Sequence, residues 1–423
     1  MDINKLLQGV DCGCGRHHAC DIQYVYIERD ATRHLAEICQ SAQNILLVAD
    51  ENTFAAAGEG VVAALEGKNL RKLIFSGESL LIPNEDAIEA VRAKLEGICM
   101  IVGIGSGVVQ DLCKYISHFE KIPYVIVATA PSMDGYASTG AAMITDGMKV
   151  TYAVGLPVAI VADTAVLANA PMDMIQAGYG DVIGKFSALN DWKLSKLVND
   201  EYFCPYIYEL TQQQIQRTIR LAEGLLRRDE ESVKTLMEAL TVIGILMSFA
   251  GSSRPASGSE HHLSHFFEIT GILGTTPYFS HGVDVAYSTV ITAMVREEIL
   301  KRPFPDKLYR PAGQVYAQRM QALYKSSAAG CMALQEKMGR YANTTIDELL
   351  AKEDKIRQVL KEMPTAQQIE EFLSLGALDI GAFYKLYGKE KIRDAVLYAK
   401  DLKDRYTVLW LYYDLFGGEV DVQ

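Results

Sequence analysis

Residues 98–107 read Ile-Cys-Met-Ile-Val-Gly-Ile-Gly-Ser-Gly, an apolar run that ends in closely spaced glycines. The apolar part predicts a buried strand, and the following residues, as far as Phe119, have helical periodicity. Glycines between a strand and a helix let backbone N–H groups approach a pyrophosphate, and the helix N-terminus adds partial positive charge. The stretch does not match the full G-x-G-x-x-G pattern, so a tight turn without a ligand is the alternative interpretation.

Further apolar runs alternate with helical patterns on both sides of this turn. The expected strands are residues 44–50, 72–75, 124–128 and 158–162. The expected helices are residues 53–65 and 84–95, the second with Asn84 as its N-cap. Strands separated by single helices predict a parallel, doubly wound sheet. Residues 141–154 differ, because Asp146-Gly147 between two apolar runs predicts a hairpin.

Beyond residue 163 the sequence changes from strand patterns to long helical patterns. These patterns cover residues 215–227, 231–249, 283–300, 312–338, 354–363 and 392–415. We therefore expect two domains, an α/β dinucleotide-binding domain over residues 1–163 and an all-α domain over residues 164–423 that binds metal and substrate. The region from Thr345 to the C-terminus is expected to add helical packing or a dimer contact.

Composition excludes several classes of protein. The chain has 423 residues, too many for one ordinary core, and its 49% hydrophobic and 22% charged residues are near globular averages. A net charge of −12 argues against nucleic-acid binding, which needs a basic surface to release counterions. No apolar run approaches the roughly 20 residues that span a bilayer, and the N-terminus has no signal-peptide pattern. We expect a cytoplasmic protein without a membrane span.

The eight cysteines fall into two groups. Most are scattered through apolar stretches, which indicates buried thiols in a reducing compartment. Cys12, Cys14 and Cys20 instead lie beside His17 and His18. A site for a soft metal is one interpretation, but C-x-C lacks the usual C-x₂₋₄-C spacing of zinc knuckles. A structural or incidental role is favoured.

The strand expected at 124–128 is followed by Thr-Ala-Pro-Ser-Met-Asp-Gly-Tyr-Ala-Ser, residues 129–138. Ligands of open α/β sheets bind at the carboxyl ends of the strands, where this loop begins. Its small hydroxyls can bond a phosphate or an amide, and Asp134 supplies one carboxylate. An ordinary Asp-Gly turn is the alternative.

Three segments of the helical half carry residues that can bind a metal. Asp181 lies between glycines at the start of a helical pattern, and His281 precedes another helix. His261 and His265 are spaced i,i+4 and therefore share one helix face. Four of the eight histidines fall within 21 positions. One carboxylate and two imidazoles make a divalent-metal site that leaves coordination positions for water or substrate.

Taken together, these segments resemble the bacterial, arabinose-operon type of glycerol-1-phosphate dehydrogenases. That family belongs to the superfamily of glycerol dehydrogenase, iron-containing alcohol dehydrogenases and dehydroquinate synthase. The resemblance covers nearly the whole chain and rests on residues 103–107, 129–138, 180–186 and 253–265, on His281-Gly282, and on the opening Cys-Gly-Cys-Gly-Arg-His-His at 12–18.

The resemblance implies a role for individual residues. It assigns the metal to Asp181, His261 and His281, with His262 as the alternative to His261, and substrate contact to His265 and Asp134. It assigns the dinucleotide to Gly103, Gly105, Ser106, Gly107, Thr129, Ser132 and Ser138, with Asp50 or Asn52 at the adenosine ribose. Ser106 stands where many relatives have a glycine.

The expected function is interconversion of dihydroxyacetone phosphate and sn-glycerol 1-phosphate by hydride transfer, with NAD or NADP and a divalent metal (zinc, nickel or iron). Arg254 is a candidate for the substrate phosphate, because a guanidinium matches phosphate geometry. The alternatives are a glycerol dehydrogenase with the same metal site, a cyclase resembling dehydroquinate synthase, and an inactive binding or regulatory relative. A homodimer is expected from base rates.

Overall fold

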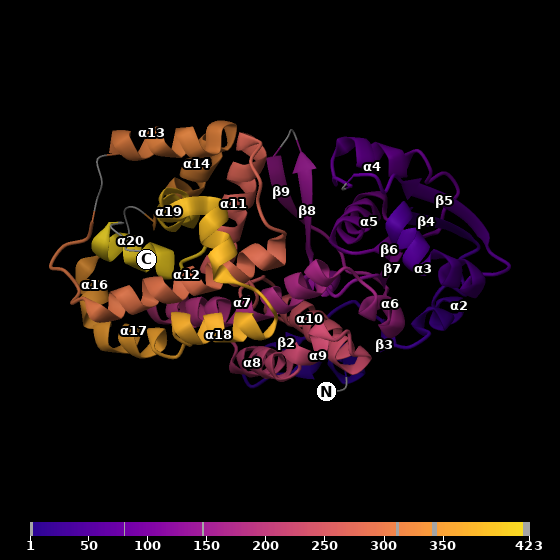
Figure 1. The fold of residues 1–423 in the computed structure, drawn as a ribbon, viewed down its shortest axis with the longest axis horizontal. Coiled ribbons are helices and arrows are strands. Elements are labelled where there is room, and N and C mark those ends of the chain that lie inside the picture. Colours follow the sequence, from indigo (N-terminus) through magenta and orange to yellow (C-terminus); the bar gives the residue numbers. More distant parts are fainter. Residues whose placement is uncertain (1–2, 80, 146–147, 310–312, 341–344, 418–423) are drawn as a thin grey trace. The chain divides into compact units, whose positions relative to one another are not determined.

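The computed structural model describes residues 3–79, 81–145, 148–309, 313–340 and 345–417. The chain packs as two compact units, one formed by Met1–Val182 with Gln216–Ser253 and the other by Ile183–Ile215 with Arg254–Gln423. Figure 1 labels their elements. The domain limits expected at residue 163 stay a prediction, because compact packing does not show which parts of a chain fold alone.

The first unit contains a six-stranded sheet in the order β3-β10-β7-β6-β4-β5, with every neighbouring pair parallel. Its strands are β3 (Tyr24–Glu28), β4 (Asn44–Asp50), β5 (Asn69–Phe75), β6 (Met100–Gly105), β7 (Tyr124–Ala128) and β10 (Ala159–Asp163). The predicted parallel α/β fold is confirmed. The edge strand β3 was missed, because it precedes the alternating pattern and is only half-buried.

Alternating side chains of each strand cover the two faces of this sheet. Ile45, Leu47 and Ala49 of β4 join a buried cluster with η1 (Ala31–His34), α2 (Leu35–Ile38) and α3 (Glu51–Ala64). On the other face, Gly103 of β6 lies against α5 (Gly107–Glu120). The helix α4 (Glu85–Arg92) begins as predicted, since the side chain of Asn84 accepts the backbone N–H of Ala87.

The remaining elements of the first unit are short or follow the sheet. They are α1 (Ile3–Leu7), β1 (Val10–Asp11), β2 (His17–His18), η2 (Asp134–Ala137), β8 (Gly140–Thr145), β9 (Met148–Ala153), α6 (Thr164–Ala168), α9 (Ala222–Leu226) and α10 (Glu230–Ala250). The antiparallel pair β8–β9 confirms the hairpin, while its turn at Asp146-Gly147 lies outside the described residues. Within the described ranges, α10 alone is long and apolar enough to cross a membrane, but it is mostly buried and reads as a core helix.

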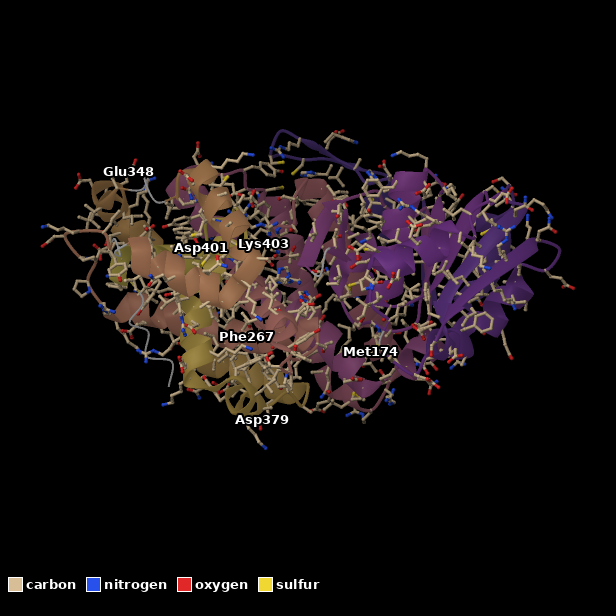
Figure 2. The ribbon with its side chains drawn as sticks, turned by 90° about the horizontal axis from the view of Figure 1, so that it is seen from above. Met174, Phe267, Glu348, Asp379, Asp401 and Lys403 are labelled. Atoms are coloured by element: carbon tan, nitrogen blue, oxygen red, sulfur yellow. The ribbon has the colours of Figure 1, made fainter. Side chains whose placement is uncertain are left out.

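The second unit is helical. Its elements are α11 (Ser259–Gly274), α12 (His281–Lys301), α13 (Gly313–Tyr324), η3 (Lys325–Ser327), α14 (Ala328–Met338), α16 (Ile346–Ala351), α17 (Glu353–Leu360), α18 (Ala366–Leu375), α19 (Ile380–Tyr398), η4 (Ala399–Leu402) and α20 (Val408–Phe416). The long helices α7 (Met172–Asn199) and α8 (Pro205–Arg220) begin in one unit and end in the other. Phe267 of α11 stacks on Tyr387 of α19 with ring centroids 4.0 Å apart; Figure 2 labels Phe267.

Three predicted helices are divided in the structure. The pattern at 312–338 breaks at Lys325, whose φ of 47° ends α13, and Ala312 lies outside the described residues. The pattern at 392–415 breaks at Thr407, an extended residue before α20. The pattern at 215–227 starts earlier, at Pro205, because proline favours a first helical position, and it is interrupted at Leu221. The apolar spacing of the sequence continues across each break, so the pattern did not indicate where these helices end.

A buried carboxylate joins four helices of the second unit. Asp191 of α7 accepts the first backbone N–H of α11, at Ser259 (2.6 Å), and that of α20, at Val408 (2.9 Å). The same carboxylate accepts the guanidinium of Arg296 on α12 at 2.6 Å. Both charged side chains are almost completely buried. The carboxylate thus neutralises one cation and satisfies two helix N-termini.

Asp191→Asn should destabilise the second unit by about 3–5 kcal/mol, because it leaves the Arg296 guanidinium buried without its anion. Both tryptophans of the chain, Trp192 and Trp410, are buried in this unit, so tryptophan fluorescence during urea unfolding reports on it. The matched control is Asp200→Asn, which alters an exposed pair with Lys196 and should leave the midpoint nearly unchanged. Equal midpoints for the two variants would contradict the role of Asp191.

Candidate metal and cofactor site

Three histidines converge at the facing ends of α11 and α12. His261 and His265 lie one turn apart on α11, and His281 is the first residue of α12. The ring of His281 lies 5.1 Å from that of His261 and 5.7 Å from that of His265, centroid to centroid. His261 is buried, while His265 and His281 are partly exposed. The predicted crowding in sequence is therefore also a cluster in space.

Asp181 supplies a carboxylate from α7. Asp181, His261 and His281 each offer one ligand atom, and these three atoms lie within 4.8 Å of one another. Asp181 is less than one turn before Gly184, where an added Cβ would meet Val285 of α12 at 2.4 Å. Gly184 thus allows α7 to pack closely against α12.

The loop at 129–138 packs against the same part of α7. A Cβ on Gly178 would meet the carbonyl oxygen of Pro131 at 1.8 Å, so only glycine allows this approach. The backbone N–H of Asp134 donates to Oδ2 of Asp181 at 2.9 Å. Asp134 thus lies beside Asp181, and its backbone N–H makes this contact.

Glu260 orients His261, a role that the sequence analysis missed. Nδ1 of His261 lies 2.7 Å from Oε1 of Glu260, which also accepts the backbone N–H of Gly258. Opposite a carboxylate, Nδ1 carries the proton, which leaves the lone pair of Nε2 for a cation. Complete burial raises the pKa of Glu260 above its ordinary value, while the N–H of Gly258 acts against the shift. The sequence signal for this orienting role was a glutamate directly before a histidine.

The structure distinguishes His261 from His262. His262 is completely buried, and neither of its ring nitrogens has a hydrogen-bond partner among the described residues. Burial, followed by the nearby cations of Lys403 and Arg405, lowers its pKa well below the ordinary value. The group of possible metal ligands includes His261 and not His262, which favours the choice of His261.

The glycine turn joins β6 to α5 as predicted. A Cβ on Gly103 would meet Sγ of Cys113 at 2.8 Å, and one on Gly105 would meet Val109 at 2.6 Å. These two glycines therefore allow α5 to pack closely on β6. Ser106 occupies the N-cap position without a side-chain cap bond, and Gly107 is the first residue of α5. The turn ends at a helix N-terminus, the position that favours a phosphate group.

Lys114 holds the neighbouring loop in place. The apolar spacing of the sequence did not indicate this role. Its ammonium group is buried and donates to the carbonyl oxygens of Gly135 (2.9 Å) and Gly140 (2.8 Å) and to Oγ of Ser138 (3.4 Å). Burial lowers the pKa of Lys114, and Asp111 acts against the shift. The backbone N–H of Thr129 donates to Gly105, which ties the loop to the glycine turn.

Other predicted cofactor residues have structural contacts. Ser132 lies near the buried hydroxyl of Tyr136, which donates to the carbonyl oxygen of Ala130 at 2.7 Å. Asp50 ends β4 and caps α3, since its Oδ1 accepts the backbone N–H of Thr53 at 2.9 Å. Asn52, the alternative at the ribose, donates to the carbonyl oxygen of Gly77. The position of Asp50 beside the strand that carries the glycine turn agrees with the prediction, and its ribose contact stays a prediction.

Arg254 lies in a buried polar cluster of the second unit. Its guanidinium pairs with Glu201 and donates to the carbonyl oxygen of Tyr406 (2.9 Å) and to Oγ of Ser195 (3.2 Å). All three guanidinium nitrogens thus have protein acceptors. A phosphate would have to compete with the carboxylate of Glu201 for this side chain.

Known proteins match both the fold and the sequence. Residues 26–171 match the family of iron-containing alcohol dehydrogenases. The glycerol dehydrogenase of Schizosaccharomyces pombe has the same fold, with a TM-score of 0.55, 19% identity, and coverage of 86% of this chain and 91% of that one. The fold is thus that of the iron-containing alcohol dehydrogenase class.

Two relatives define the family more closely. The NAD(P)+ glycerol-1-phosphate dehydrogenase of Halalkalibacterium halodurans is 34% identical over 69% of this chain and 75% of its own length. The enzyme of the same name from Bacillus licheniformis is 26% identical over 98% of this chain and 95% of its own. The chain belongs to the glycerol-1-phosphate dehydrogenase family, which confirms the resemblance drawn from the sequence.

Glu260→Gln should weaken divalent-metal binding by about 10–100-fold, because the amide no longer holds His261 in its orientation as a charged acceptor. Competition with a chromophoric chelator measures the affinity of the full-length protein for zinc or nickel. Glu371→Gln, an exposed carboxylate on α18, is the control and should bind metal as the unaltered protein does. Unchanged affinity in Glu260→Gln would exclude the orienting role.

Proposed function

We propose that this protein reduces dihydroxyacetone phosphate to sn-glycerol 1-phosphate, and catalyses the reverse reaction, with NADH or NADPH as hydride donor. One observation carries the proposal: Asp181, His261 and His281 offer three ligand atoms within 4.8 Å of one another in a chain of the glycerol-1-phosphate dehydrogenase family.

The three side chains suit a divalent cation. A carboxylate and two imidazoles accommodate zinc, nickel or iron and leave coordination positions open. Asp181 is completely buried, so its charge needs a cation or strong donors nearby. When bound, the metal would polarise the substrate carbonyl as a Lewis acid, an effect of several kcal/mol. Glu260 would hold His261 ready for this ligation.

Other residues would supply a proton, contact the substrate and bind the cofactor. His265, one turn beyond His261, would hold a proton at a ring nitrogen and deliver it to the substrate oxygen, directly or through water. Asp134 would contact substrate beside Asp181. The glycine turn from Gly103 to Gly107, with Ser106 at its centre, would receive the pyrophosphate at the N-terminus of α5.

The cofactor proposal extends to three small hydroxyls and one acid. Thr129, Ser132 and Ser138 would contact the dinucleotide from the loop fixed by Lys114, and Asp50 would accept the adenosine ribose. Such an acid favours NADH over NADPH, because it repels a 2′-phosphate. Arg254 as the phosphate ligand stays a prediction, and the pairing with Glu201 makes it the weakest assignment of the set. A homodimer is proposed from base rates. The cytoplasmic location is a separate proposal.

Steady-state assays should show faster turnover, as kcat/KM, for dihydroxyacetone phosphate than for dihydroxyacetone or glycerol, with metals added back one at a time. The family of this chain is the reason for the expected preference. Comparable rates on the unphosphorylated compounds would favour a glycerol dehydrogenase. Turnover without net oxidation of NADH would favour a cyclase, and no turnover with any metal would favour a binding or regulatory protein.

Replacing His261 or His281 by Ala should remove turnover together with the metal equivalent that the Asp181, His261 and His281 group binds. The loss should exceed the roughly 10–100-fold effect of removing an outer partner of a metal ligand, because a ligand itself is lost. Metal content by mass spectrometry and the rate of dihydroxyacetone phosphate reduction are the two measurements. His118→Ala, near the end of α5, is the control and should preserve both. Full turnover in a His261→Ala protein that has lost this metal equivalent would refute the site.

A further inference from the structure

The N-terminal hairpin places two thiols in one tight turn. Strands β1 and β2 pair antiparallel, with Val10 opposite His18. The backbone N–H of Cys12 donates to the carbonyl oxygen of Arg16 (3.1 Å), and that of Gly15 donates to the carbonyl oxygen of Cys12 (3.0 Å). Gly15 has a φ of +85°, which a side chain would strain. The turn therefore presents Cys12 and Cys14 side by side.

Both sulfurs are held in the manner of metal ligands. The backbone N–H of Cys14 donates to Sγ of Cys12 at 3.5 Å, and such bonds stabilise a thiolate. Sγ of Cys14 lies 3.4 Å from Nε2 of His18. Sulfur and nitrogen ligands of one tetrahedral zinc ion are about 3.5 Å apart, given Zn–S of about 2.3 Å and Zn–N of about 2.0 Å.

His18 is oriented for ligation. Its side chain is buried, and its ring stacks on Phe249 with centroids 5.3 Å apart. Nδ1 lies 3.1 Å from the carbonyl oxygen of Phe249, an acceptor that requires Nδ1 to carry the proton. This tautomer leaves the lone pair on Nε2, the atom nearest Cys14. A histidine that ligates zinc through one nitrogen commonly donates the other to a carbonyl group.

A fourth ligand comes from a distant part of the sequence. Cys204 is completely buried and directly precedes α8. One ligand atom from each of Cys12, Cys14, His18 and Cys204 lies within 4.8 Å of the others. We propose that these four side chains bind a structural zinc ion. Cys204 lies far from the C-x-C pair in the chain, so local spacing rules could not find it.

The donor set defines the metal and the role. Three thiolates and one imidazole are soft ligands that select zinc in a reducing compartment. Four protein ligands complete a tetrahedron and leave no position for substrate, which makes the site structural. Binding releases the protons of three thiols to solvent. The proposal does not depend on the function of the Asp181 group.

Cobalt substitution tests this site separately from the catalytic one. The full-length protein is produced in zinc-depleted medium with Co²⁺, and its ultraviolet and visible absorption is recorded. We expect a thiolate-to-cobalt charge-transfer band, which the Asp181, His261 and His281 group cannot give because it has no sulfur. Cys14→Ser and Cys204→Ser should lose most of the band, and His261→Ala should retain it.

Cys20→Ser is the matched control, since Cys20 lies two residues from His18 and is not among the four. It should retain the band and one equivalent of bound zinc. Should Cys14→Ser or Cys204→Ser fail to fold, chelation of zinc-loaded unaltered protein gives the answer, as three further thiols should become reactive. A cobalt protein without the band, equal loss in Cys20→Ser, or no gain of reactive thiols on chelation would overturn the proposal.

Discussion

The carboxylate of Asp191 is the interaction on which the helical unit depends. It binds the first N–H groups of α11 and α20 and the guanidinium of Arg296, all away from solvent. Helix N-termini and a buried cation each carry positive charge, so one anion stabilises three elements that would otherwise lack partners. Since α11 carries His261 and His265, the same contact fixes the start of the helix that bears the site. Burial raises the pKa of Asp191, and Arg296 opposes this shift.

The helix α7 carries both Asp191 and Asp181. Asp181 and Asp191 are ten positions apart on one continuous helix, and Gly184 between them packs against α12, which begins with His281. Asp191 anchors the part of α7 that belongs to the helical unit. Glu260 adds the final orientation by fixing the tautomer of His261. This hydrogen bond exists without an ion, which would lower the reorganisation that metal binding at His261 requires.

Particular residues show what the sequence could and could not predict. Strong apolar runs bounded by glycine and asparagine predicted β4, β6, β7 and the start of α4, because these signals are local. The edge strand β3 was missed because it precedes the alternating pattern, and the breaks at Lys325 and Thr407 were missed because apolar spacing continues across them. His261, His265 and His281 stood out through their crowding. Glu260, Lys114 and Asp191 did not, because their roles depend on partners that only the folded chain brings near.

The two groups of possible metal ligands suit different roles. An acid and two imidazoles leave coordination positions open and suit a metal that must bind and release a substrate oxygen. Three sulfurs and one imidazole close the coordination sphere, and thiolates hold zinc too firmly for exchange to be part of turnover. A chain that places a soft, saturated site apart from a mixed, open one can retain structural zinc while its catalytic site takes whichever divalent metal is available. The metal that each site selects would then depend on its own ligand atoms, although both sites belong to one chain.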